Sequence, residues 1–152
     1  MKNFSEATAT KSNIEISLHL RPIGEPCVRV KVCDIVIVDD VIKCDTEFKH
    51  CHDLPTPLDF SIELYDKKYS LEFETAIIVD KMMINGISII PEMSHLFEYV
   101  NDHDFTEPTC YLGFNGIWRL DTKDCFYQWW HQQSGQGWLL KPRSVGLAIG
   151  KV

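Results

Sequence analysis

The chain has 152 residues, of which 45% are hydrophobic and 24% charged, a composition typical of one globular domain with its own core. Its formal net charge is −7 and its pI is about 5.3, so the surface is acidic overall. Because phosphate backbones repel such a surface, we expect no nucleic-acid partner. No run reaches the roughly 20 apolar residues that cross a bilayer, so we expect no membrane partner either.

The first 13 residues are polar and contain no apolar stretch of the kind found in a secretory signal. We therefore expect a flexible N-terminal arm over residues 1–13 and synthesis in the cytoplasm. In that reducing setting the six cysteines are expected to be free and mostly buried thiols, not a disulfide framework.

Apolar and polar residues alternate with a period of two in three segments, 14–20, 27–32 and 58–64. This alternation is the pattern of half-buried antiparallel strands. Proline- and glycine-containing turns separate the segments, and the sequence favours a further strand over residues 69–80.

Two Asn-Gly pairs, at 85–86 and 115–116, predict hairpin turns. Only residues 93–100 predict a helix, since apolar residues recur there at helical spacing after a proline that suits a first turn. Strands are expected again at 126–130 and 137–140.

These elements predict an all-β domain, an antiparallel β-sandwich of jelly-roll type with one short helix, over residues 14–142. Residues 143–152 follow as a C-terminal tail. They form either an edge strand of the same sheet or a strand donated to a neighbouring subunit.

The segment "FYQWWHQQSGQGWLLKP", residues 126–142, is unusually rich in large rings and neutral hydrogen-bonding groups. On a strand, Trp129 and Trp130 point to opposite faces, so one of them needs a cover. A sugar that stacks on the rings, a partner subunit or internal packing around a loop at 132–135 would each supply it. The residues predicted to contact a ligand or a partner subunit are Trp118, Tyr127, Trp129, Trp130, His131, Gln133 and Trp138.

Motifs that support catalysis are missing from the sequence. It contains no G-x-S-x-G elbow, no glycine-rich phosphate loop and no H-E-x-x-H pair. We therefore expect a protein that is not an enzyme and has no catalytic residues.

The segment "NDHD", residues 101–104, is a candidate calcium loop, because calcium prefers several oxygen ligands from flexible loops. Ordinary turn chemistry explains the same composition, since Asn and Asp are common in loops of β proteins. Calcium is therefore considered only as a possible ligand.

Residues 111–142 resemble the C-terminal part of small proteins encoded by tailed bacteriophages. The resemblance lies in a Leu-Gly-aromatic-Asn-Gly-x-Trp pattern at 112–118, the aromatic-rich segment at 126–130 and Gly-Trp-Leu-Leu at 137–140. It implies a component of a virion.

Residues 58–89 resemble the core of calcium-dependent carbohydrate-binding modules that bind xylan. That resemblance implies a β-sandwich whose loop aspartates hold the ion and whose bound sugar completes the coordination of the ion. Asp102 and Asp104 are the nearest matches to such calcium ligands.

We therefore expect a structural or assembly protein of a phage virion, made in the host cytoplasm and acting through contacts with other virion subunits as a homo-oligomer. The alternative is a calcium-assisted carbohydrate-binding module that attaches to a glycan of the host surface.

Overall fold

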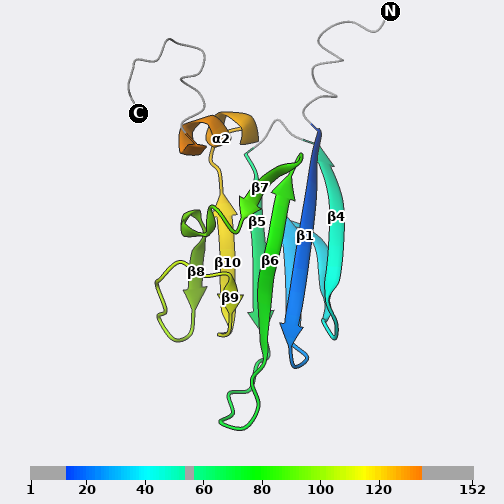
Figure 1. The fold of residues 1–152 in the computed structure, drawn as a ribbon, viewed down its shortest axis with the longest axis vertical. Helices are drawn as coiled ribbons and strands as arrows, with labels where there is room; N and C mark the ends of the chain where they lie inside the picture. The colour runs from blue at the N-terminus through cyan, green and yellow to red at the C-terminus, as the bar shows by residue number, and fades with distance from the viewer. Residues whose placement is uncertain (1–12, 54–56, 135–152) are drawn as a thin grey trace, which may run out of the picture.

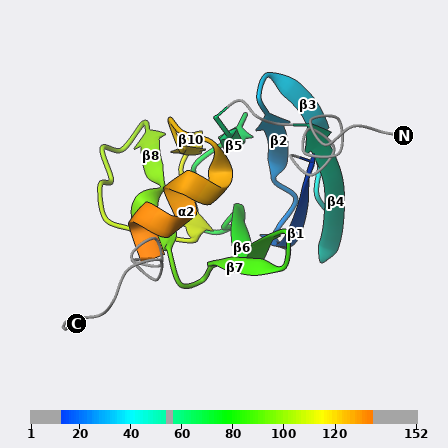
Figure 2. The same cartoon turned by 90° about the horizontal axis from the view of Figure 1, so that it is seen from above.

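The computed structural model describes residues 13–53 and 57–134, which form two antiparallel sheets packed face to face (Figures 1 and 2). The first five-stranded sheet contains β4 (Thr46–Asp53), β1 (Asn13–Ile23), β6 (Ala76–Ile84), β7 (Ile87–Ile90) and β9 (Tyr111–Leu112), which pairs with β6. The second contains β3 (Ile35–Val41), β2 (Cys27–Val32), β5 (Asp59–Tyr65), β10 (Gly116–Asp121) and β8 (Glu98–Asn101). The predicted all-β sandwich with one short helix is confirmed.

The core lies between the sheets and follows the predicted alternation. Alternate residues of β1, β2 and β5 are buried, namely Ile14, Ile16, Leu18, Leu20, Val28, Val30, Val32, Phe60, Ile62 and Leu64. The residues between them face outward, where charged side chains pair. On the outer face of the second sheet, Arg29 binds Glu63 at 2.6 Å and Asp39 at 3.3 Å.

The strand predicted at 126–130 is wrong, because residues Phe126–Ser134 form the helix α2. Phe126, Trp129 and Trp130 are spaced i, i+3, i+4, which places all three rings on one helix face. This face packs on the core, whereas a strand would have divided the rings between two faces. Figure 2 shows α2 lying across one end of the sandwich.

The helix predicted at 93–100 is also wrong. Only Ser94–Leu96 form a short 3₁₀ turn (η1), and Phe97 is already extended at φ −92° and ψ 141°. Residues Glu98–Asn101 then form β8, in which Tyr99 points inward while Glu98 and Val100 point outward. Pairing with β10 therefore outweighs the weak helical periodicity, and residues 98–101 form a strand.

The strand predicted at 69–80 begins only at Ala76, so residues 66–75 form a loop that projects beyond the sheets (Figure 1). The hairpin at Asn85-Gly86 is confirmed, with φ values of 50° and 80° in the turn between β6 and β7. The hairpin predicted at 115–116 is wrong. β9 pairs with β6 and β10 pairs with β5 and β8, so residues 113–115 cross from one sheet to the other.

All six cysteines are free, as expected. The expectation that most of them are buried is wrong, because none is fully buried. Cys27, Cys33 and Cys110 are half-buried, and the other three are exposed. Within the described residues, no helix has the length and apolar character needed to cross a membrane. Most of the predicted arm (residues 1–12), the strand predicted at 137–140 and the tail at 143–152 lie outside the described residues, whereas Asn13 opens β1.

Candidate functional site

Helix α2 covers one end of the sandwich and packs both of its tryptophans against the core. Trp129 is 5% exposed, and Trp130 is partly buried and packs on the core. The side chain of Trp129 is therefore not available to a ligand or partner, which corrects the prediction for this residue. The prediction that one of the two must point outward fails because it assumed a strand, and in the helix both contact the core.

Trp118 is likewise a core residue. It is 1% exposed, stacks on Phe97 with 3.9 Å between the ring centroids, and donates from Nε1 to the backbone oxygen of Thr109 at 3.0 Å. The prediction that Trp118 contacts a ligand or partner is therefore wrong, because its inward position on β10 places the indole between the sheets.

Tyr127, His131 and Gln133 are exposed residues of α2, so their predicted contact with a ligand or partner stays a prediction. The Tyr127 hydroxyl accepts a hydrogen bond from the Asn85 amide, and Asn85 in turn accepts one from the backbone of Glu15. These bonds tie the helix to the β6–β7 turn. Trp138 lies outside the described residues.

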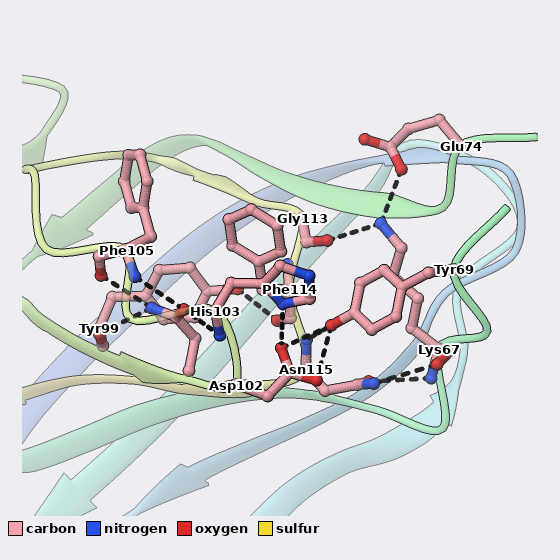
Figure 3. Close-up of polar contacts among 11 residues, drawn as sticks. Lys67, Tyr69, Glu74, Tyr99, Asp102, His103, Phe105, Gly113, Phe114 and Asn115 are labelled. Atoms are coloured by element: carbon pink, nitrogen blue, oxygen red, sulfur yellow. Dashed lines mark hydrogen bonds and ion pairs between the residues drawn. The ribbon is translucent and has the colours of Figure 1, made fainter. Parts of the chain in front are cut away.

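A row of ring side chains lies at the opposite end of the sandwich from α2, where three loops meet (Figures 1 and 3). We call Tyr69, His103, Phe114 and Phe105 the ring row. The His103 ring stacks on Phe114 at 4.3 Å, and Tyr69 and Phe105 lie 4.6 Å from His103 and 6.0 Å from Phe114, respectively. Tyr69 is 44% and Phe105 37% exposed, so the row faces solvent.

The loop carrying Phe114, residues 113–115, is fixed by the hydroxyl of Tyr99. This hydroxyl donates to the backbone oxygen of Phe114 and accepts from its amide at 2.9 Å. Burial raises the pKa of Tyr99 to about 12, so the neutral phenol that this arrangement requires is favoured. The position of the Phe114 ring is therefore set before any ligand binds.

Asn115 joins the same loop to the one carrying Tyr69. Its side chain accepts from the amide of Lys67 at 2.8 Å and donates to the backbone oxygen of Lys67 at 3.0 Å. The backbone amide of Asn115 donates to the Tyr69 hydroxyl at 2.9 Å, and this hydroxyl donates to the Asp102 carboxylate, whose oxygens lie at 2.6 and 2.8 Å. Asp102 belongs to the third loop, so all three loops are linked.

Lys67 links the loop that carries Tyr69 to the loop that carries Phe114. Its side chain is only 4% exposed, and its ammonium donates to Glu74 and to the backbone oxygen of Gly113, each at 2.6 Å (Figure 3). The bond from Lys67 lowers the pKa of Glu74, which also accepts from the Tyr111 hydroxyl at 2.8 Å. Burial and Glu74 together raise the pKa of Tyr111 to about 12.

Asn101 organises the third loop in the way expected of an Asn at a turn. Its side-chain oxygen accepts from the amides of His103 and Phe105, each at 3.0 Å, and its amide group donates to the backbone oxygen of Phe105 at 2.8 Å. The sequence left turn chemistry and calcium binding as two explanations for residues 101–104. Turn chemistry accounts for Asn101.

The Asp102 carboxylate is already engaged, which bears on the predicted calcium site. Besides the bond from Tyr69, it binds His103 Nδ1 at 2.7 Å, and both contacts lower the pKa of Asp102. Calcium takes roughly six to eight oxygen ligands. Within the described part of the chain, no three His, Cys, Asp or Glu side chains are placed to hold a metal ion. The calcium site predicted at Asp102 and Asp104 therefore stays a prediction, with the Asp102 carboxylate already bound to Tyr69 and His103 in this structure.

Comparison with protein-family models and with curated proteins found no match. Among solved structures the chain is similar to vCBM60 in complex with galactobiose, at 10% identity and a TM-score of 0.52, covering 70% of this chain and 97% of that one. It is also similar to a selenomethionine form of vCBM60, described among two families of calcium-dependent carbohydrate-binding modules, at 12% identity and a TM-score of 0.51, covering 71% and 90%. The protein thus has the β-sandwich fold of these modules.

The ring row was missed from the sequence because its members come from three loops without periodicity. The segment "NDHD" was noticed, but for its carboxylates and not for His103. The segment "LGFNG" was interpreted as a hairpin, which hid the position of Phe114 beside the other rings. A cluster that forms only when the loops meet leaves no pattern along the chain.

Proposed function

We propose that this protein is a carbohydrate-binding module and that the ring row is the surface on which the sugar lies. The observation that carries the proposal is the solvent-exposed row itself, held on loops whose polar groups bind one another. Exposed apolar surface of this kind, bordered by hydrogen-bonding side chains, is typical of ligand sites.

The chemistry of the row suits a sugar. The C–H groups of a pyranose form an apolar face that packs on an aromatic ring, while its hydroxyls need polar partners. Nδ1 of His103 faces the Asp102 carboxylate, so Nε2 is the ring nitrogen left for a hydrogen bond with a sugar hydroxyl. Because the loops are already ordered by their mutual bonds, little conformational entropy is lost on binding.

The fold similarity supports the proposal, since one of the similar structures is vCBM60 in complex with galactobiose. The proposed site differs from the predicted one in that the sugar is expected to bind without calcium. Tyr69 and His103 occupy the Asp102 carboxylate, and no further carboxylate of the described residues joins it in a metal-binding group. Binding is therefore expected to survive removal of calcium.

The test is binding of the full chain to a panel of immobilised and soluble polysaccharides, with Tyr69→Ala and Phe105→Ala as site variants. Each variant is expected to weaken binding roughly five- to thirtyfold, since loss of a stacked ring costs on the order of 1–2 kcal/mol. Tyr127→Ala is the matched control, because it removes an exposed ring at the opposite end, on α2.

Chelation of calcium forms a separate arm of the same experiment. Unchanged binding in the presence of a chelator is expected. Binding lost on chelation would restore the predicted calcium-assisted site, whereas binding lost in Tyr127→Ala but retained in Phe105→Ala would move the site to α2. Failure of every polysaccharide to bind would contradict the proposed function.

A further inference from the structure

A groove of about 480 Å³ runs beside the ring row. One wall is the strand β8 with the preceding Leu96, and the other is the segment 104–109 that leads toward β9. β8 is the last strand of its sheet and pairs with β10 on one side only, so no described strand covers its other edge. The volume of the groove is within the range of roughly 300–1,000 Å³ typical of ligand sites.

Phe105 connects the groove to the ring row. Its side chain lines the groove, and its ring also lies 6.0 Å from that of Phe114. A molecule lying on the ring row can therefore continue past Phe105 into the groove without leaving the protein surface. A single sugar would fill only one of the two regions, whereas a chain of sugars fits both.

The groove is acidic. Its lining includes Glu98, Asp104 and Glu107, and the lining residues include no lysine or arginine. The one basic side chain among them is His95. Carboxylate or sulfate groups on a ligand would therefore meet like charges, and they would do so within a Debye length of roughly 8–10 Å.

We propose that the groove along β8 holds further units of a polysaccharide whose sugars carry no negative charge. This inference rests on the proposed function and adds the class of ligand and the direction in which the chain runs. The ring row supplies stacking, and the acidic groove rejects uronate or sulfated chains.

The test compares uncharged glucans, mannans and galactans with the same polymers oxidised at C6, in which primary alcohols have become carboxylates. Oligosaccharides of increasing length from each are titrated into the full chain at low salt. The uncharged chains are expected to bind more tightly as they lengthen beyond two units. They should exceed their oxidised counterparts by about tenfold, a gap that shrinks as salt is added.

The variant Glu98→Gln/Glu107→Gln removes charge from the groove without changing its shape. It is expected to narrow the gap between the long uncharged and oxidised chains to about two- or threefold. The matched control is Glu15→Gln/Glu47→Gln, which makes the same change in net charge on exposed residues of the other sheet.

The possible outcomes separate the two claims. The groove proposal would be overturned if oxidised chains bound equally or more tightly, or if both double variants narrowed the affinity gap between uncharged and oxidised chains alike. The ring row would then remain as the site. Affinity that does not change with chain length would also overturn the groove proposal. If neither form of any polysaccharide binds, the proposed function fails, and the inference fails with it.

Discussion

Lys67 is the residue on which the arrangement of the loop end depends most. Its nearly buried ammonium binds Glu74 and the backbone oxygen of Gly113, and lies 5.2 Å from the centre of the Tyr69 ring. Burying a charge is costly unless every donor finds a partner, and here the partners come from two loops. A single side chain therefore fixes loops that are 46 residues apart in sequence.

Lys67→Ala is expected to lower the free energy of unfolding by about 1–3 kcal/mol, because Gly113 and Glu74 lose their donor. Glu74 is 48% exposed and can bind water, which keeps the cost below that of a fully buried pair. Urea denaturation measures the loss, with the exposed neighbour Lys68→Ala as control. Equal stability of the two variants would show that Lys67 is not a structural cation.

Tyr99 and Tyr111, each with its pKa raised to about 12, predict how stability depends on alkaline pH. The folded state favours their neutral form, so their contribution to stability is complete below about pH 10, the unfolded value. It is lost as pH rises from 10 through 12. Ultraviolet absorbance of tyrosinate, followed together with thermal unfolding, checks this.

We expect part of the tyrosine titration to be delayed above pH 11 and to coincide with loss of structure. Tyr99→Phe should remove one delayed proton and also weaken the hold on Phe114. Titration of every tyrosine near pH 10 in a fully folded protein would contradict the prediction.

At the scale of elements, α2 shows how one segment can satisfy two periodicities. Residues 126, 128 and 130 alternate as in a strand, while 126, 129 and 130 lie on one helix face. The large rings decide between them, because only the helix buries Phe126, Trp129 and Trp130 together. At β8 the sequence pattern favoured a helix, but the residues form a strand because they pair with β10.

Trp129→Ala is expected to destabilise the fold by about 3–5 kcal/mol, as large-to-small changes of buried aromatic residues do. His131→Ala, on the exposed side of the same helix, should change stability by less than about 0.5 kcal/mol. Chemical denaturation separates the two. A small effect of Trp129→Ala would mean that α2 is not part of the core and would restore Trp129 as a surface residue.

Strands with clean alternation were predictable because their inward residues must be apolar wherever one face is buried. β1, β2 and β5 are such strands. The β6–β7 turn was predictable for another reason, its Asn-Gly pair. β3 was not predicted, since its exposed Ile35 and Val36 break the alternation. The crossing at 113–115 was not predictable either, since an Asn-Gly pair gives a turn but not the sheet to which each flanking strand belongs.

For the whole molecule, the fold could be predicted and the site could not. Alternation along single strands adds up to two sheets with a core between them. The ring row instead depends on contacts such as Tyr69 with Asp102 and Tyr99 with Phe114, which join residues 33 and 15 positions apart. Nothing in the local sequence of either partner specifies the other.

Association with a virion and assembly as a homo-oligomer stay predictions based on the resemblance to phage proteins. They are compatible with glycan binding if the module lies on a virion surface. Light scattering of the full chain is expected to give a discrete oligomer, which is lost when residues 1–13 or 144–152 are removed while the sandwich stays folded. A monomer, or an oligomer unaffected by both truncations, would contradict this role for the termini.

The most direct measurement is a titration of the isotopically labelled full chain with a polysaccharide-derived oligosaccharide, followed by amide chemical shifts in NMR spectra. The account predicts shifts concentrated at Tyr69, His103, Phe105 and Phe114, with α2 unaffected. Shifts concentrated at Tyr127 and His131, or no shifts with any sugar, would contradict the claim that the loop end is the binding site.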